Sequence, residues 1–224
     1  PLHYLRNEAD VMSFARYLIN KMEKNEESFM LGSEIALLTA LICYVKMERP
    51  EKDQNFASIM KMLRVTQVNA MDPNAESNLD VIFDNLERKN PEHIAVKQWK
   101  IFKLNHPHDQ ERVITSLAAK LSIFDLPMIE KITSTDDLEL DQMKDQTTVL
   151  FVKIPTINDS YDILTELLCF QLMNMKDCDH VSGWKEYQRN KKHEDDLLKD
   201  IREISTAAER AMFDSIWEFE EKEK

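Results

Sequence analysis

The chain holds only two glycines and seven prolines among its 224 residues, so it has few of the residues that tight turns require. Because Gly and Pro mark the frequent turns of β architectures, their scarcity favours helices joined by polar loops. Hydrophobic residues make up 43% of the chain, which is enough for one sizeable core. We therefore expect a mainly α protein built as a helical bundle.

The strongest helical pattern runs from Phe29 to Val45, where apolar residues recur every three or four positions. Pro50 ends this pattern because proline cannot continue a helix. We expect this segment to form the central helix of the bundle. Asn7 and Asn55 each stand just before another amphipathic pattern, so both are predicted N-caps.

Later segments also carry helix start signals. Asn90-Pro91 combines a capping residue with a proline that suits the first helical turn, and it predicts a helix that ends near Leu104. Leu126-Pro127 predicts a short helix. Residues 134–137, with the sequence STDD, predict a further cap.

Residues 147–155, TTVLFVKIP, interrupt the helical patterns with a nearly continuous apolar run. Such a run predicts a strand that is buried on both faces, and a strand needs neighbours to pair its backbone groups. Apolar residues from Ile163 to Met173 then predict another helix. Strand, polar turn and helix make half of a βαβ unit, so we expect one βα remnant near residues 148–175.

From residue 176 the sequence becomes a mixture of acidic and basic residues. Apolar residues between Leu197 and Phe219 are spaced by three or four, which predicts a long amphipathic C-terminal helix with highly charged outer faces. Three cysteines without a framework spacing suit a reducing compartment. No apolar run reaches the roughly 18–20 residues that cross a membrane, so we expect a soluble, cytoplasmic chain without membrane contact of its own.

No pattern in the sequence predicts a catalytic, cofactor-binding or metal-binding site. Neither Gly32 nor Gly183 stands in a glycine-rich loop with the lysine that phosphate binding requires. HPHD at 106–109 and DCDH at 177–180 gather potential metal ligands, but their spacing matches no zinc motif. We therefore expect no enzyme activity, no cofactor and no metal.

One segment stands apart from the formal net charge of −12, which opposes contact with nucleic acid or anionic membranes. Residues 88–120 contain seven basic against three acidic side chains. On a helix, the three lysines of residues 97–103 are predicted to lie opposite Ile94 and Ile101, with the tryptophan near the boundary. The candidate partner-binding residues are Lys97, Trp99, Lys100 and Lys103. The alternative is an ordinary solvated lysine face beside a packed tryptophan.

Five segments, in this order, resemble the TraG-type coupling proteins of conjugative type IV secretion systems, in the style of Gram-positive conjugative elements. The segments are PLHYLRNEADV, SEIALLTALICYVKMERPEKDQNFASIMKML, NPEHIAVKQWKIFK, SLAAKLSIFDLPMIEKITSTDDLELDQM and TTVLFVKIPTINDSYDILTELLCFQLMN. The resemblance covers about residues 1–175, and it is specific through the ordered series rather than through any single motif.

Proteins of this family are membrane-anchored, hexameric, RecA-like ATPases that bring a relaxase–DNA substrate to the secretion channel. The resemblance implies that residues 1–146 hold the all-α substrate-receptor domain with its leading helix. It implies that residues 147–175 are a strand-helix remnant of the nucleotide-binding domain, whose sheet would supply the missing strand neighbours. The phosphate-binding loop and the strand ending in an Asp-Glu pair that family members carry are not recognisable here. Residues 176–224 form a charged helical tail outside the resemblance.

The resemblance therefore implies a protein-binding receptor domain that docks relaxase or relaxosome accessory proteins for DNA transfer. Single-stranded DNA is a weaker candidate partner, and a hexamer is implied only for full-length family members. Two alternatives stay open at this point. In the first, the chain is a truncated helical protein that regulates or self-associates. In the second, it is a fragment that retains ATPase activity or contacts single-stranded DNA.

Overall fold

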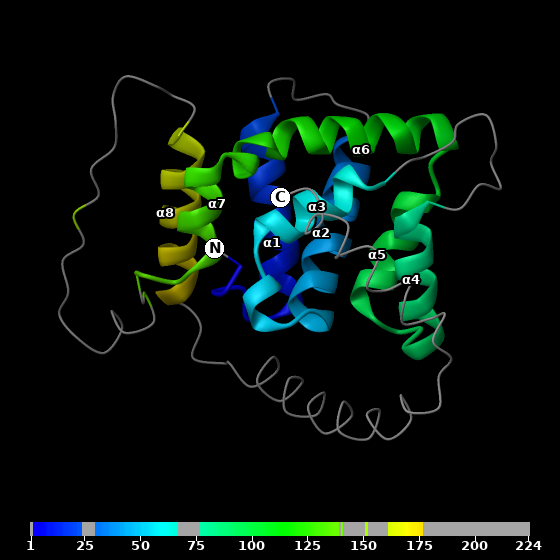
Figure 1. The fold of residues 1–224 in the computed structure, drawn as a ribbon, viewed down its shortest axis with the longest axis horizontal. Helices are drawn as coiled ribbons and strands as arrows, with labels where there is room; N and C mark the ends of the chain where they lie inside the picture. The colour runs from blue at the N-terminus through cyan, green and yellow to red at the C-terminus, as the bar shows by residue number, and fades with distance from the viewer. Residues whose placement is uncertain are drawn as a thin grey trace, which may run out of the picture. The chain divides into compact units, whose positions relative to one another are not determined.

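The computed structural model describes residues 2–23, 30–66, 77–138, 140, 151 and 161–176. The chain divides into two units, Pro1–His180 and Val181–Lys224, and all described residues lie in the first. This described part contains eight α-helices, two short 3-10 helices and no strand (Figure 1), so the prediction of a mainly α protein is confirmed. In chain order the elements are α1 Glu8–Met22, α2 Leu31–Glu48, η1 Glu51–Asp53, α3 Phe56–Arg64, α4 Asn78–Lys89, α5 Ile94–Lys103, α6 Pro107–Leu121, η2 Ser122–Asp125, α7 Pro127–Ser134 and α8 Asp162–Lys176.

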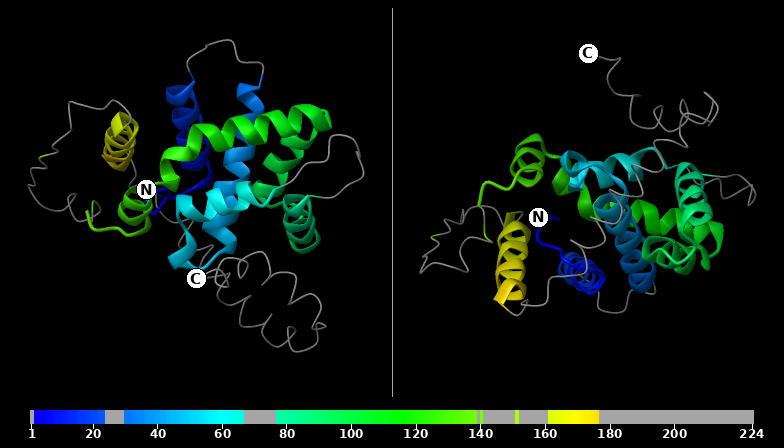
Figure 2. Two further views of the ribbon diagram at one scale, coloured as in Figure 1. Left: turned by 45° about the horizontal axis from the view of Figure 1, so that its top comes forward. Right: turned by 90° about the horizontal axis from the view of Figure 1, so that it is seen from below.

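Helix α2 is the central helix of the described unit, as its apolar sequence predicts. Residues 36–47 are buried without a break, so this helix is enclosed on all sides. It packs against α1, α3, α5 and α6, and α1 and α5 lie on either side of it (Figures 1 and 2). A helix that is apolar all round is stable only when other helices cover every face.

Two predicted N-caps are confirmed. The Asn7 side chain accepts a hydrogen bond from the Asp10 N–H at 2.8 Å and caps α1. The Asn55 side chain accepts from the Ser58 N–H at 3.0 Å and caps α3. In both cases a short amide side chain satisfies a backbone donor that the helix itself leaves unpaired.

The predicted helix start at Asn90-Pro91 is wrong. The Asn90 N–H donates to the Leu86 carbonyl at 2.8 Å, so Asn90 is the C-cap that ends α4. Helix α5 begins later, at Ile94, and His93 is its N-cap. The Nδ1 atom of the buried His93 side chain accepts from the Ala95 N–H at 3.1 Å. The residue predicted to start a new helix is therefore the C-cap of the preceding one.

The STDD segment, predicted to form a cap, is used for a long-range contact instead. The Tyr4 hydroxyl donates a hydrogen bond to the Asp136 carboxylate and accepts one from the Leu140 N–H at 2.9 Å. Tyr4 and Leu140 are both buried, and Leu168 and Leu172 of α8 pack against them. The start of the chain, the segment after α7 and helix α8 therefore share one small core.

Helix α8 confirms the helix that the apolar residues from Ile163 to Met173 predict. It packs against α1, where the rings of Tyr17 and Phe170 stack with centroids 4.5 Å apart. Lys21 of α1 forms an ion pair with Glu166 of α8 at 3.2 Å. Residues on both sides of the predicted domain boundary at 146 thus contribute to one packed unit.

Two predicted elements lie outside the described residues. One is the strand at 147–155, of which only Phe151 is described; that side chain is 90% exposed and lies in no regular element. The other is the amphipathic tail, which is outside the description from residue 177 onward. Both remain predictions.

Candidate protein-binding surface on helix α5

Helix α5 carries the candidate partner-binding residues, and its buried face decides which of them can reach a partner. Each helical residue is turned by about 100° from the one before it. Residues 95, 96, 99 and 102 therefore share one face, and all four of these side chains are buried. This face packs against α2 and α4.

Trp99 lies at the centre of that buried face and is only 5% exposed. Its ring stacks on Phe83 of α4, with centroids 4.6 Å apart and an interplanar angle of 13°, and it also contacts Phe102. Trp99 was predicted to lie near the boundary and is instead packed in the core, as in the alternative of a packed tryptophan. Ile101 was predicted to lie opposite the lysines, but it is 48% exposed on their side of the helix. Burying the larger indole removes more apolar area from water and gains an aromatic contact.

The outward face of α5 combines two lysines with two aliphatic side chains. Ile101 is 48% exposed and Leu104, the residue that ends the helix, is 85% exposed. By the helical period they share a sector of about 100° with the exposed Lys97 and Lys100. We call these four residues the α5 strip. The sequence predicted the lysines of this strip but not its aliphatic members. A buried Trp99 would have predicted that Ile101 and Leu104 are exposed, because both lie on the far side of the helix from position 99.

Each lysine of the predicted set is paired with a carboxylate. The pairs are Lys97 with Glu92 at 2.7 Å, Lys100 with Glu87, and Lys103 with Asp80 at 2.8 Å. The hydrogen bond from Lys97 lowers the pKa of the fully exposed Glu92. The first two pairs lie on the surface, and exposed ion pairs add little to the stability of a fold, so a partner can replace them at little cost.

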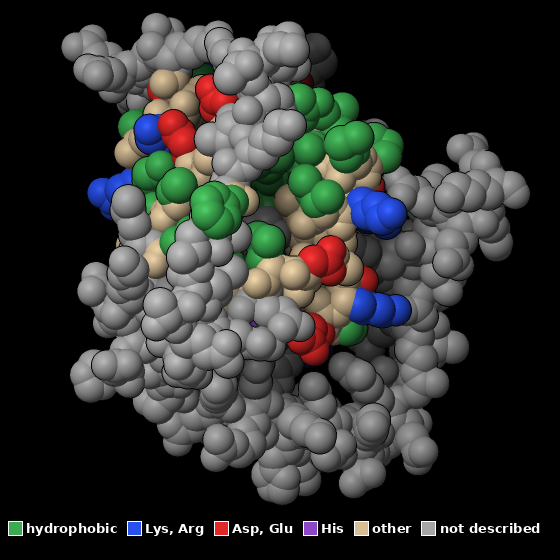
Figure 3. Space-filling view, turned by 90° about the vertical axis from the view of Figure 1, so that its left-hand side faces the viewer, with side chains coloured by type: hydrophobic (Ala, Val, Ile, Leu, Met, Phe, Trp, Pro, Cys, Tyr) green, Lys and Arg blue, Asp and Glu red, His purple; other side chains and the backbone are tan. Residues whose placement is uncertain are grey.

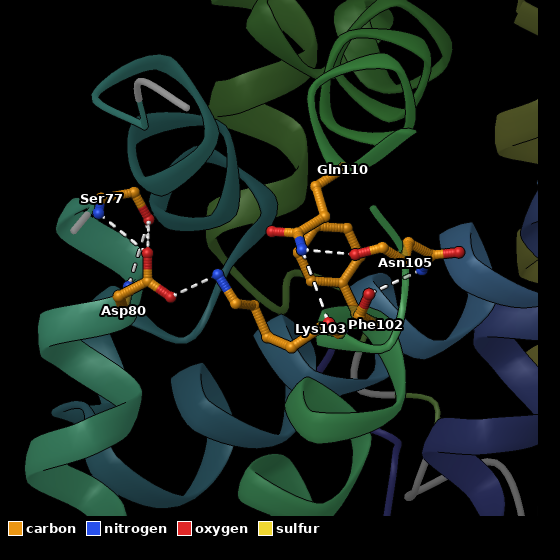
Figure 4. A network of polar contacts seen from close by, with 6 residues as sticks. All are labelled: Ser77, Asp80, Phe102, Lys103, Asn105 and Gln110. Atoms are coloured by element: carbon orange, nitrogen blue, oxygen red, sulfur yellow. Dashed lines mark hydrogen bonds and ion pairs between the residues drawn. The ribbon is translucent and has the colours of Figure 1, made fainter. Parts of the chain in front are cut away.

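Lys103 differs from the other two lysines because its partner is part of the fold (Figure 4). Asp80 forms a capping box with Ser77 at the start of α4. Burial acts to raise the pKa of Asp80, but hydrogen bonds from Lys103 and Ser77 outweigh it, and the net pKa is lowered. The Lys103 Nζ atom also lies 5.7 Å from the centre of the Trp99 ring. Lys103 therefore connects α4 to α5.

The C-terminal end of α5 is held by side chains of the following loop and helix (Figure 4). The buried Gln110 side chain donates to the Asn105 carbonyl at 2.7 Å and to the Lys103 carbonyl at 3.5 Å. The Asn105 amide in turn donates to the Phe102 carbonyl at 2.6 Å. These bonds satisfy carbonyls that a helix end leaves unpaired. The backbone on both sides of Leu104 is thereby held against α6.

The described residues contain no group of three or more His, Cys, Asp and Glu side chains that could hold a metal ion. In the HPHD segment, His106 precedes α6 as its N-cap residue and Pro107 is in the first turn. The DCDH segment lies outside the described residues. Within the same described ranges, no helix has both the length and the apolar character to cross a membrane.

These observations define a mainly α-helical unit with an exposed lysine and aliphatic strip on α5. Comparison with protein families matches residues 2–180 to the family described as type IV secretory system conjugative DNA transfer, and the chain belongs to this family. The resemblance to coupling proteins is thereby confirmed, and the role of the chain lies in conjugative DNA transfer by a type IV secretion system. Comparisons with curated proteins and with solved structures gave no match.

Proposed function

We propose that this chain is the substrate-receptor part of a conjugative coupling protein and docks relaxase or relaxosome accessory proteins. The observation that carries the proposal is the family match over residues 2–180, most of which fold into the helical unit described above. The exposed surface of α5 supports binding, because the free energy of the system falls when a partner covers Ile101 and Leu104 and removes them from water.

A protein partner fits this surface better than single-stranded DNA does. Binding of single strands relies on aromatic rings that stack with bases, and Trp99 is buried against Phe83. The net charge of −12 also repels phosphates, most strongly at low ionic strength. Ile101 and Leu104 offer no charge and no ring to a nucleotide.

We also propose that the chain acts by binding rather than by ATP hydrolysis. Phosphoryl transfer requires backbone donors that cradle the phosphates, a lysine and a metal-holding acid. Gly32 lies in the first turn of α2, and the residues around it do not form the glycine-lysine pattern of a phosphate-binding loop. Isothermal titration with Mg-ATP should give no heat of binding; micromolar affinity would contradict this part of the proposal.

A pull-down with purified relaxase and accessory proteins of the same conjugative element tests the docking function. We expect the parent chain to retain at least one of them and a Lys97→Glu/Lys100→Glu variant to retain less. Lys52→Glu/Lys131→Glu is the matched control, because both lysines are exposed and lie outside the α5 strip, and the net charge changes by the same amount. A parent chain that retains none of these proteins would refute the docking function.

A further inference from the structure

The α5 strip is built as a compact patch rather than a scatter of surface residues. Lys97 and Ile101 are four positions apart, as are Lys100 and Leu104, and positions three or four apart are neighbours on a helix. The strip stands on a rigid base, since the opposite face of α5 is packed in the core and the Gln110 side chain holds the helix end. A fixed patch can bind a partner without first being ordered.

We propose that the α5 strip receives an acidic amphipathic helix of the docked protein. Apolar side chains of that helix cover Ile101 and Leu104, while its carboxylates pair with Lys97 and Lys100. This assignment rests on the proposed docking function and adds the chemistry of the partner segment. Charge complementarity argues for it, because Lys97 and Lys100 already pair with exposed carboxylates, Glu92 and Glu87, and carboxylates of a docked helix can take the place of these weak pairs.

The aliphatic members decide between carboxylates and phosphates as the partner groups. An amphipathic helix presents apolar side chains at spacings of three and four beside its charged residues, which matches the mixed character of this strip. A phosphate backbone would leave Ile101 and Leu104 uncovered. The largest gain from docking comes from Leu104, which is 85% exposed.

The intramolecular acids give the proposal a test that a purely structural role would not satisfy. Glu92 is fully exposed and pairs with Lys97 at 2.7 Å. A docking helix must replace this pair or tolerate the extra negative charge. Glu92→Gln should therefore strengthen capture of the partner by about two- to fivefold, an amount typical of one exposed ion pair.

Capture of relaxase and accessory proteins by Ile101→Ser/Leu104→Ser is the decisive measurement. We expect a loss of about tenfold or more in affinity, as for residues at the centre of an interface. The matched control is Met128→Ser/Ile132→Ser on α7, where the two side chains are 72% and 55% exposed and four positions apart. Hydrophobic side chains also gather on the face viewed in Figure 3, the side on which Figure 1 shows α7. Circular dichroism verifies that both variants remain folded.

Each outcome of this experiment has a definite meaning. Loss at the α5 strip with no loss at α7 supports the assignment, and a gain with Glu92→Gln strengthens it. Equal capture by the parent and the α5 variant overturns the assignment and leaves the docking function in place. A parent chain that captures nothing overturns both. Loss of binding to a single-stranded oligonucleotide, without loss of protein capture, assigns the strip to DNA and refutes the proposal.

Discussion

Lys120 of α6 connects three helices through two ion pairs, and replacing it should destabilise the fold strongly. Its Nζ atom lies 2.6 Å from Glu23, the C-cap residue of α1, and it also pairs with Glu34 of α2. Glu34 is 0% exposed, so its carboxylate has lost its water and depends on the lysine. Lys120→Met keeps much of the side-chain volume but removes the positive charge that pairs with Glu34.

A buried charge that loses its partner typically costs about 3–5 kcal/mol. Since domains of this size are stable by about 5–15 kcal/mol in total, the variant should lose a large share of its stability. Urea unfolding followed by far-UV circular dichroism measures this difference. The double variant Glu34→Gln/Lys120→Met should recover most of it, because an uncharged amide in place of the carboxylate is far cheaper to bury.

The pH dependence supplies an independent check. Burial acts to lower the pKa of Lys120, but its hydrogen bonds to Glu23 and Glu34 outweigh burial and raise the net pKa. A raised pKa means that the stabilisation is complete below the pKa of the unfolded chain, about 10.4. It is lost as the pH rises through the folded pKa. A Lys120→Met variant within 1 kcal/mol of the parent at neutral pH, or a double variant no better than the single one, would refute this reasoning.

Burial lowers the pKa of Lys46 to about 8, so the free energy of unfolding should rise as the pH increases from about 8 toward 10.5. In urea unfolding at pH 7, Lys46→Met should increase the free energy of unfolding by at most about 3 kcal/mol. Burial raises the pKa of the Cys43 thiol to about 12 while Cys169 is exposed, so in a Cys178→Ser background a thiol reagent should modify Cys169 in the native protein and Cys43 only after unfolding. Trp99→Ala should lower the free energy of unfolding by about 3–5 kcal/mol, whereas Lys97→Glu should change it by less than about 1 kcal/mol; similar effects of the two substitutions would contradict the assigned faces of α5.

The sequence by itself determined the features that depend on neighbours a few positions away. Asn7 and Asn55 cap their helices through backbone groups three residues ahead, so their role is visible in the local sequence. The apolar run of α2 required enclosure whatever the surrounding topology, because no face of that helix could be left in water. The ordered segments that resemble coupling proteins likewise indicate the family, because their order along the chain is a property of the sequence alone.

Tertiary structure decided which face of α5 is buried. It thereby decided that Ile101 and Leu104, two of the four residues of the α5 strip, are exposed. The sequence of α5 offers apolar residues on more than one side. Packing against α2 and α4, where Trp99 stacks on Phe83, places Trp99 in the core and leaves Ile101 outside. Likewise, nothing local connects Tyr17 to Phe170, whose rings meet because α1 and α8 pack together. The physical reason is that caps and periods act over one turn of helix, whereas the choice of buried face depends on surface supplied by residues far along the chain.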